Sequence, residues 1–429
     1  MTRIALASLL LLLASCRVQP VDTDNLDAIA RDYVLLSLTI GEKEEGYIDA
    51  YYGPPELQAQ AKAEAVGQSL DALAKRVAEL RKRVAEANRG AEKIDQRRAK
   101  FLTAQLTAAG TRLRMLKGEK LSFEDEAEGL FAVRPKLKPL PSYDALLEQV
   151  EKLVPGAGPL AERVERFQQR FTIPADKLKP VFDAAIAECK SRTVQHIALP
   201  KGERFDLGFV TGKSWSGYNY YKGGYRSRIE VNTDLPIRIS RAVDLGCHEG
   251  YPGHHVLNAL IEQHLSKGRN WIEFSVYPLY SPQSLLAEGS ANYGIELAFP
   301  SRERLVYEAG KLYPLAGLPA AEAERYFELQ NAMRDLQSAR FTIARELLEG
   351  RIDEAESVRL SQHYLLVSPE RARQLTEFTK QYRSYVINYG LGQDMVRADI
   401  EAAGSTPAAR WKRMEQLLSE PTLPSDLRS

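Results

Sequence analysis

Apolar positions recur at helical spacing along most of this 429-residue chain. Residues 26–40 and 56–116 carry apolar residues three or four positions apart, which is typical of amphipathic helices. One such stripe consists of Leu70, Leu73, Val77, Leu80 and Val84. The charged residues between the apolar positions indicate a solvated helix face. Further helices are predicted at about 143–153 and 159–171, after a proline-rich connector at 134–142. The pattern therefore predicts a mainly α protein.

One region departs from the helical pattern. Residues 205–210 and 228–233 alternate between apolar and polar positions, as strands do, and the segment between them is rich in Gly and Tyr. We therefore expect a small β-sheet at about 205–235. The edge of such a sheet can pair with an extended peptide through main-chain hydrogen bonds. Its interleaved aromatic and basic residues would also suit single-stranded nucleic acid, a carbohydrate, or simple hairpin packing.

Three of the six histidines lie in one eight-residue run at the end of the next helix, which is predicted to start at Asp234 and Pro236. The run is His248-Glu249-Gly250-Tyr251-Pro252-Gly253-His254-His255. Zinc hydrolases use a His-Glu pair followed by a second His to combine a metal site with a general base. The usual spacing places the second His four residues after the first, where this chain has Pro252.

Helix geometry shows what this spacing requires. On a regular helix His254 lies roughly 120° around the axis from His248, and His255 lies about 10 Å further along it. Neither imidazole could then share a metal ion with His248, because ligand nitrogens lie only about 2.0–2.1 Å from zinc. Pro252 cannot donate to the carbonyl of His248, and Gly253 follows it, so we expect a bulge or a helix restart that returns His254 toward His248. The alternative is a structural kink whose histidines cap and hydrogen-bond.

The motif resembles the signature of the bacterial domain-of-unknown-function 885 family, a helical group distantly related to gluzincin metallopeptidases such as carboxypeptidase Taq. Other segments are similar to elements of the same family, from about Tyr47 to Gln393. They are Asp49-Ala50-Tyr51-Tyr52-Gly53-Pro54-Pro55, Val231-Asn232-Thr233, Glu288-Gly289-Ser290-Ala291-Asn292-Tyr293 and Tyr389-Gly390-Leu391-Gly392-Gln393. The family's Arg-x-x-x-Asp-x-Gly-x-His stretch is absent between the last two segments. The resemblance implies a zincin-like catalytic unit in which the small sheet lies beside the metal helix.

A catalytic zinc takes three protein ligands and keeps one position open. The resemblance implies that Glu288, on a second and otherwise apolar helix, joins His248 and His254 as the third ligand. Glu249 is then the general base, and Tyr389 is a candidate hydrogen-bond donor to the developing oxyanion. Zinc is the expected cofactor, although imidazole and carboxylate ligands also suit manganese, iron or cobalt.

For three residues near these positions the sequence also allows a role outside the metal site. The sequence does not separate His254 from His255; we take His254 as the ligand and His255 as a supporting residue or an oxyanion partner. Tyr389 belongs to a helical stripe with Tyr382 and Tyr385, which is also typical of core packing. Cys247 adjoins His248 but faces another direction on a helix, so a small buried residue is the preferred interpretation.

The first residues predict export. Thr2-Arg3 precedes an apolar stretch at 4–13 that is too short to span a bilayer, and Leu13-Ala14-Ser15-Cys16 reads as a lipobox. We expect cleavage after residue 15, a lipid on Cys16 and attachment to the bacterial cell envelope, at the outer membrane if the organism has two membranes. Simple cleavage to a soluble periplasmic protein is the alternative.

The expected organisation contains one large helical catalytic unit. Its parts are a signal peptide (1–15), a tether (16–25), an N-terminal helical region (26–142), a zincin-like catalytic region (143–404) and a short helix with a frayed polar tail (405–429). Removal of Arg3 with residues 1–15 leaves 57 basic and 57 acidic residues. This balance and the predicted export argue against a nucleic-acid partner.

Cys189 and Cys247 are the only cysteines besides Cys16, so at most one disulfide forms within the mature chain. Three functions follow from the sequence. The first is a zinc peptidase or amidase acting on a peptide or amide substrate. The second is a metal hydrolase for esters or cell-wall amides, and the third is a non-catalytic envelope lipoprotein that keeps the scaffold for binding.

Overall fold

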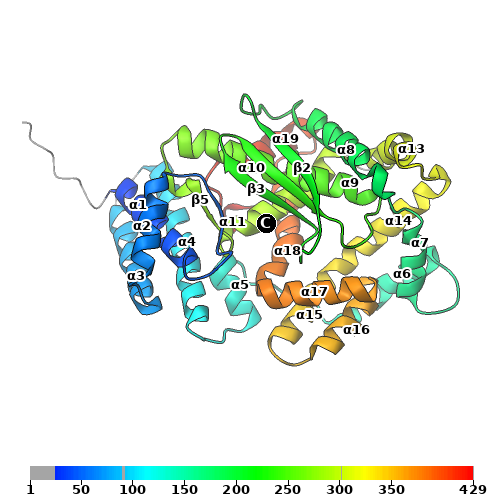
Figure 1. Cartoon of the computed structure of the whole chain (residues 1–429), viewed down its shortest axis with the longest axis horizontal. Helices are drawn as coiled ribbons and strands as arrows, with labels where there is room; N and C mark the ends of the chain where they lie inside the picture. Colours follow the sequence, from blue (N-terminus) through cyan, green and yellow to red (C-terminus); the bar gives the residue numbers. More distant parts are fainter. Residues whose placement is uncertain (1–24, 89–91, 301, 429) are drawn as a thin grey trace, which may run out of the picture.

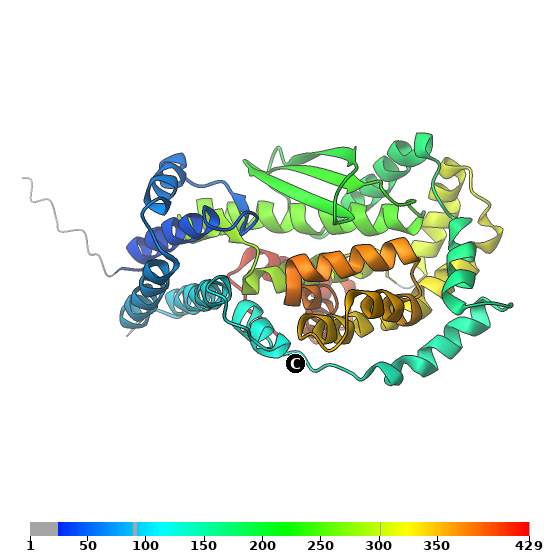
Figure 2. The same cartoon turned by 60° about the horizontal axis from the view of Figure 1, so that its bottom comes forward.

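The computed structural model describes residues 25–88, 92–300 and 302–428. The described chain is mainly helical, with two small β-sheets, as the apolar pattern predicts. Helices α1 to α4 form one end of an elongated molecule, and α6, α7 and α14 lie at the other end (Figures 1 and 2). The expectation of a mainly α protein with a small sheet is confirmed.

The N-terminal region is a bundle of amphipathic helices. It comprises α1 (Leu26–Gly41), α2 (Pro55–Ala65), α3 (Leu70–Ala87), α4 (Lys93–Leu116) and α5 (Phe123–Phe131). The predicted stripe on α3 packs against α4 and α1, because Leu73, Val77, Leu80 and Val84 are buried. Burial of each such side chain contributes roughly 1.5–3 kcal/mol. The Ser69 hydroxyl caps α3 by accepting a hydrogen bond from the Ala72 N–H at 3.1 Å.

This region is not purely helical, because it contributes a strand to the centre of the molecule. Strand β1 (Ile48–Tyr51) pairs antiparallel with β5 (Val276–Pro278). Three residues before β5, the buried Glu273 accepts hydrogen bonds from Arg98 of α4 on both carboxylate oxygens, at 2.6 and 3.0 Å. These contacts join residues 26–142 closely to the later part of the chain.

The predicted sheet has three strands. They are β2 (Arg204–Val210), β3 (Gly217–Gly223) and β4 (Arg226–Asn232), in the order β2-β4-β3. Strand β4 is parallel to β2 and antiparallel to β3, so β3 forms one edge. In Figure 2 the sheet covers one side of the long helical segment that contains α10, and α17 lies on the other side of that segment.

The central helices carry the residues of the His-Glu motif and of its predicted partners. They are α9 (Ser240–Leu245), the π-helical turn η3 (Gly246–Gly250), α10 (His254–Ile261), α11 (Pro282–Ala298) and α18 (Ile387–Glu401). Helices α11 and α18 approach each other very closely, because both have a glycine where they cross. A Cβ on Gly289 would lie 2.4 Å from the carbonyl oxygen of Gly392, so no other residue fits there.

The remaining helices surround this centre. They are α6 (Asp144–Leu153), α7 (Leu160–Gln169), α8 (Leu178–Thr193), α12 (Glu303–Tyr307), α13 (Tyr313–Ala316), α14 (Ala323–Arg334), α15 (Ala339–Leu348), α16 (Glu354–Leu365), α17 (Pro369–Tyr382) and α19 (Pro407–Ser419). Among the described residues, no helix is both long enough and apolar enough to cross a membrane. The predicted signal peptide, Cys16 and nearly all of the predicted tether lie outside the described residues.

The C-terminal tail differs from the expectation of a frayed end. After α19, Leu423 is only 3% exposed. Arg97 of α4 forms an ion pair with Glu420 at 2.7 Å, and Lys100 of the same helix pairs with Asp426. The prolines and polar residues of this segment suggested fraying, but long-range contacts to the N-terminal bundle hold it in place.

Candidate metal centre

The helix that carries the motif breaks where Pro252 predicts. The chain leaves α9 through the wider turn η3, and the Tyr251–Pro252 peptide bond is cis. The Gly253 N–H then donates to the Cys247 carbonyl at 3.0 Å, and α10 begins at His254. A Cβ on Gly253 would lie 1.7 Å from the His248 carbonyl oxygen, so this tight return requires glycine. The restart brings the rings of His248 and His254 to 4.7 Å between centroids.

Glu288 of α11 faces both imidazoles. Its Oε2 lies 3.2 Å from His248 Nε2, and its Oε1 lies 3.7 Å from His254 Nε2. All three side chains are nearly buried, with 8 to 14% of each exposed. Two imidazole nitrogens and a carboxylate that converge in this way form a donor set suited to a divalent transition metal. The structure therefore brings together the three residues that the sequence nominated as ligands.

Asn292 determines which nitrogen of His248 is available. The Asn292 side-chain N–H₂ donates to the Tyr389 carbonyl at 3.1 Å, so its Oδ1 is turned toward His248 Nδ1, also at 3.1 Å. Since this oxygen can only accept, His248 Nδ1 carries the hydrogen. With Nδ1 as the donor to Asn292, Nε2 points at Glu288 Oε2, which has no hydrogen-bond partner. The two atoms lie 3.2 Å apart, an approach that a metal ion bound to both, or a proton on Nε2, makes favourable.

The pKa values of His254 and Glu288 also show that the site favours a positive charge. Burial lowers the pKa of His254, but Glu288, Glu249 and Asp49 raise it to about 9 overall. Burial raises the pKa of Glu288, yet the imidazoles of His254 and His248 hold it well below its usual range. The negative charge of the carboxylates thus favours a positive charge near the two imidazoles. A bound metal ion would supply such a charge.

Glu249 lies beside the two histidines. Its carboxylate oxygen and one nitrogen from each of His248 and His254 are within 4.8 Å of one another. Strand β3 approaches this carboxylate closely, because a Cβ on Gly217 would lie 2.9 Å from Glu249 Oε1. Burial raises the pKa of Glu249, and this effect outweighs the opposing influence of the histidines. A carboxylate with a raised pKa, close to the donor set, is suited to take up and release a proton.

The tyrosine that contacts the donor set is Tyr385, and sequence reasoning had placed it in a packing stripe. Its hydroxyl donates to Glu288 Oε1 at 2.8 Å. Tyr389, the predicted oxyanion donor, lies one turn further, with its ring 5.9 Å from that of Tyr385. Burial and the charges of Glu288 and Glu249 raise its pKa. Tyr389 therefore lies close to the centre without contacting a predicted ligand through its hydroxyl.

His255 does not join the centre, so the proposed supporting or oxyanion role is wrong. The ring is fully buried on another face of α10, where Nδ1 pairs with Ser227 Oγ at 2.8 Å and Nε2 with Glu203 Oε2 at 2.9 Å. Both ring nitrogens are used. The adjacent histidines face different ways because successive residues of a helix differ in direction by about 100°. His255 instead ties α10 to β4 and to the loop before β2.

Asp49 of β1 lies close enough to the centre for its charge to raise the pKa of His254. Tyr218 of β3 donates a hydrogen bond to its Oδ1. Burial raises the pKa of Asp49 to about 6; Tyr218 and His254 oppose the rise, while Glu288 and Glu249 add to it. By contrast, the Tyr51 hydroxyl donates to the Pro54 carbonyl at 2.6 Å, so it packs within its own turn. Sequence alone could not show that Asp49 lies near the centre while Tyr51 packs within its own turn.

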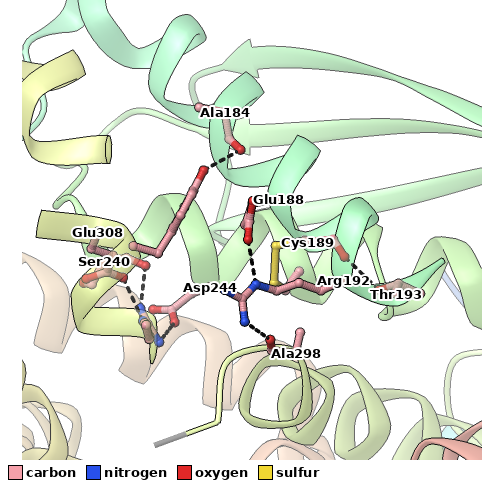
Figure 3. Close-up of a disulfide and its surroundings, with 12 residues drawn as sticks. Ala184, Glu188, Cys189, Arg192, Thr193, Ser240, Asp244, Ala298 and Glu308 are labelled. Atoms are coloured by element: carbon pink, nitrogen blue, oxygen red, sulfur yellow. Dashed lines mark hydrogen bonds and ion pairs between the residues drawn. A yellow bond between two sulfur atoms is a disulfide. The ribbon is translucent and has the colours of Figure 1, made fainter. Parts of the chain in front are cut away.

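A disulfide anchors the start of the motif. Cys247 is bonded to Cys189 of α8, 58 residues earlier, which excludes Cys247 as a metal ligand (Figure 3). The same region holds a buried ion-pair network in which Arg304 contacts Asp244 of α9 at 2.8 Å and Glu308 at 2.7 Å. Figure 3 shows Asp244 and Glu308 to one side of Cys189, with Glu188 and Arg192 of α8 beside it. The segment that carries His248 is thus fixed to its neighbours by covalent and ionic contacts.

No protein-family model matches this chain, and no curated protein matches its sequence. Among solved structures it is similar to a presumed lipoprotein from Colwellia psychrerythraea, with 14% identity, a TM-score of 0.49, and coverage of 83% of this chain and 68% of that one. A presumed lipoprotein of unknown function from Shewanella oneidensis has 15% identity and a TM-score of 0.42, with coverage of 93% of this chain and 83% of that one. The M32 carboxypeptidase from Deinococcus radiodurans R1 has 14% identity and a TM-score of 0.36, with coverage of 90% of this chain and 88% of that one. Family membership therefore stays a prediction, and the roles of the residues rest on the site itself.

Proposed function

We propose that this protein is a metal-dependent hydrolase of peptide or other amide bonds, with His248, His254 and Glu288 holding zinc or a similar divalent ion. One observation carries the proposal. The hydrogen bond from His248 Nδ1 to Asn292 directs the other ring nitrogen at an unpartnered oxygen of Glu288, 3.2 Å away. This is the arrangement by which proteins orient a histidine toward a metal.

When bound, such an ion supplies Lewis-acid polarisation of a carbonyl and activation of a water molecule. Glu249 is the group that moves protons. It accepts one proton as the water oxygen forms a bond to the scissile carbonyl carbon, and it delivers that proton to the amine nitrogen as the C–N bond breaks. Strand β3 lies against Glu249 and can align an extended substrate by main-chain hydrogen bonds. In this proposal Tyr389 donates a hydrogen bond to the carbonyl oxygen as negative charge develops there.

The proposed location is the bacterial cell envelope, with the chain exported and anchored through a lipid on Cys16. The disulfide between Cys189 and Cys247 supports export, since such bonds form and persist in oxidising compartments. Mass spectrometry of the protein purified from its host tests the anchor. A mature chain that begins at a lipid-modified Cys16 is expected, and an unmodified N-terminus would contradict it.

The proposed function is tested by metal content and hydrolysis together. We expect about one zinc per chain in the purified protein, and loss of that zinc in His248→Ala, His254→Ala and Glu288→Ala. His255→Ala should keep the metal and lower the melting temperature. His264→Ala is a matched control, because this histidine is exposed. Elemental analysis after dialysis measures all five variants.

Glu249→Gln separates metal binding from chemistry. This variant should keep zinc yet hydrolyse peptides about 10²–10⁴-fold more slowly, since it loses the proton acceptor. A wild-type chain that takes up no divalent metal would contradict the metal centre. A chain that binds zinc but cleaves no member of a broad peptide and amide library would leave a metal-binding envelope protein as the better interpretation.

A further inference from the structure

Several buried carboxylates outside the candidate metal centre pair with a cation. They are Glu273 with Arg98, Glu126 with Arg383, Glu308 with Arg304 and Asp399 with Arg413. Charged groups removed from water are costly unless they are paired, so this pattern is expected. The carboxylate of Asp49 differs, because in the part of the chain that the structure describes no lysine or arginine lies within ion-pair distance of it.

One oxygen of the Asp49 carboxylate is engaged and the other is open. The Tyr218 hydroxyl of β3 donates a hydrogen bond to Oδ1. The second oxygen, Oδ2, makes no hydrogen bond within the described residues and is not fully enclosed by them. The residue is partly exposed, so a small polar group can reach this oxygen.

The sheets place Asp49 at the candidate metal centre. Its strand pairs with β5, where Ala50 lies opposite Tyr277. Burial, together with the charges of Asp49 and Glu288, raises the pKa of Tyr277, so this tyrosine lies within reach of both carboxylates. Strand β3 approaches the same region with consecutive residues. Tyr218 binds Asp49, and a Cβ on the preceding Gly217 would lie 2.9 Å from Glu249 Oε1.

The charges around the centre leave one negative charge unmatched. With neutral imidazoles, Glu288 and Glu249 balance the two positive charges of a divalent ion, and Asp49 adds a third carboxylate. Burial raises the pKa of Asp49 to about 6, and neither the hydrogen bond from Tyr218 nor the charge of His254 offsets this rise. The group is still mainly ionised at neutral pH. A cationic group of the substrate would complete the charge balance.

Aromatic rings lie beside this carboxylate. Tyr218 and Tyr220 occupy alternate positions of β3, with ring centroids 4.5 Å apart. Burial and the charge of Asp49 also raise the pKa of Tyr382 of α17, which places a third ring near the carboxylate. The face of an aromatic ring attracts an ammonium ion. The rings and the carboxylate therefore suit the same kind of ligand, a primary ammonium group.

The position of Asp49 indicates which ammonium group of a peptide it binds. The charge of Asp49 acts on both His254 and Glu249, which are the groups next to the proposed reacting carbonyl. In a peptide, the α-nitrogen of a residue lies only roughly 2.5 Å from the carbonyl carbon of the same residue. A lysine ammonium is separated from that carbon by four further side-chain bonds. The free α-amino group is thus the cation that lies closest to the bond to be cleaved.

We infer that Asp49, with Tyr218, binds the free α-amino group of the substrate, so that the enzyme removes the first residue from the amino end of a peptide. This inference rests on the proposed hydrolase function and specifies its substrate class. A peptide with a blocked amino group is disfavoured, because it would cover the Asp49 carboxylate without supplying a positive charge.

The test compares short peptides that differ only in acetylation of the amino group, with the zinc-loaded full chain. Mass spectrometry should show products that lack the first residue. The free amines should have kcat/KM about tenfold or more above their acetylated forms, as expected for a hydrogen bond between charged groups. Asp49→Asn keeps an acceptor for Tyr218 and should bring this ratio toward one, with zinc content and melting temperature unchanged. Asp206→Asn, an exposed carboxylate on β2, is the matched control and should leave the ratio unchanged.

A second arm distinguishes the two sources of an ammonium group. Acetylated peptides that begin with lysine carry the charge on the side chain only. We expect them to be cleaved as slowly as other acetylated peptides. Cleavage as fast as that of the free amines would overturn the inference, since the side-chain ammonium would then be the group that is bound.

A third arm measures recognition without turnover. Calorimetry on the Glu249→Gln full chain compares phenylalanine amide with its N-acetylated form. Preference for the free amine, lost when Asp49→Asn is added, would support the subsite even if no hydrolysis is found. Equal binding of both forms, loss of zinc in Asp49→Asn, or cleavage only at bonds away from the amino end would overturn the inference while leaving the proposed function standing.

Discussion

The Asn292 amide bridges the ring of His248 to the backbone of Tyr389. Its nitrogen donates to the Tyr389 carbonyl, and its oxygen accepts from His248 Nδ1, each at 3.1 Å. Asn292 thus sets both the tautomer and the direction of a predicted metal ligand. It also connects α11, which carries Glu288, to α18, which carries Tyr389.

Removal of this bridge should weaken metal binding. We expect Asn292→Ala to lower zinc affinity about 10–100-fold, because supporting partners of metal ligands have effects of that size. Asn292→Asp keeps an acceptor for His248 Nδ1 and should restore most of the affinity. Competition with a chromophoric chelator measures both variants. Equal losses in the two would show that Asn292 has a packing role only.

The two neighbouring tyrosines should have separable effects. Tyr385→Phe removes the hydrogen bond to Glu288 and should weaken zinc binding about tenfold or more, since the acceptor is charged. Tyr389→Phe should leave zinc affinity unchanged and lower kcat with little change in KM, as expected for a donor used mainly in the transition state. Metal titration and steady-state kinetics on each variant give the two readouts. A fall in zinc affinity for Tyr389→Phe would contradict this division.

Glu203 should contribute pH-dependent stability. Burial alone would raise its pKa, but hydrogen bonds from His255, Lys190 and Tyr251 lower it from 4.5 to about 2. A carboxyl group whose pKa is depressed by folding stabilises the folded state at pH values above its pKa in the unfolded chain. This stability is lost as the pH falls from about 4.5 to about 2. The side chain is 7% exposed, so the contribution is on the order of 3 kcal/mol.

Thermal unfolding of the wild type and Glu203→Gln over this pH range checks the sign. The difference in melting temperature should be largest near neutral pH and should shrink below about pH 4.5. Glu188→Gln serves as a comparison, because its ion pair with Arg192 is closer to solvent. A difference that stays constant with pH would show that the carboxylate charge is not the cause.

Loss of the disulfide should affect both the fold and the metal centre. In the chain-entropy model a loop of this length gives about 4 kcal/mol of stabilisation, so Cys189→Ala with Cys247→Ala should unfold at a clearly lower denaturant concentration. Because Cys247 precedes His248, we also expect weaker zinc binding in the double variant. Retention of full zinc affinity would show that the ion pairs around Arg304 hold the segment sufficiently well.

The sequence predicted the candidate ligands better than their surroundings. The break at Pro252 and the return of His254 follow from a local rule, because a proline cannot continue the helix. The approach of Glu288 to the two histidines was implied by the family resemblance. The helix stripe on α3 and strands β2 and β4 follow from apolar periodicity, whereas β3 falls in the Gly- and Tyr-rich segment that the periodicity did not mark as a strand. The break, the stripe and these two strands depend on residues close together in the chain, which is why a single sequence suffices to predict them.

The errors concern contacts between distant segments. A helical stripe shows that Tyr385 and Tyr389 share a face, but not which hydroxyl reaches Glu288. The partners of His255, namely Glu203 and Ser227, come from other elements and could not be inferred from α10. The packed tail after α19 depends on Arg97 and Lys100 of a helix more than 300 residues earlier in the chain.

The turn η3 and the break after it place five residues between His248 and His254, yet the two rings still meet. The geometry of a zinc site depends on the positions of the ligand nitrogens. The number of residues between two histidines reflects only whether the helix that carries them is regular or interrupted. A motif search that demands a fixed count would pass over this chain, although it presents the same donor atoms. Searches that allow a Pro-Gly interruption should recover other chains that bring two histidines together in this way.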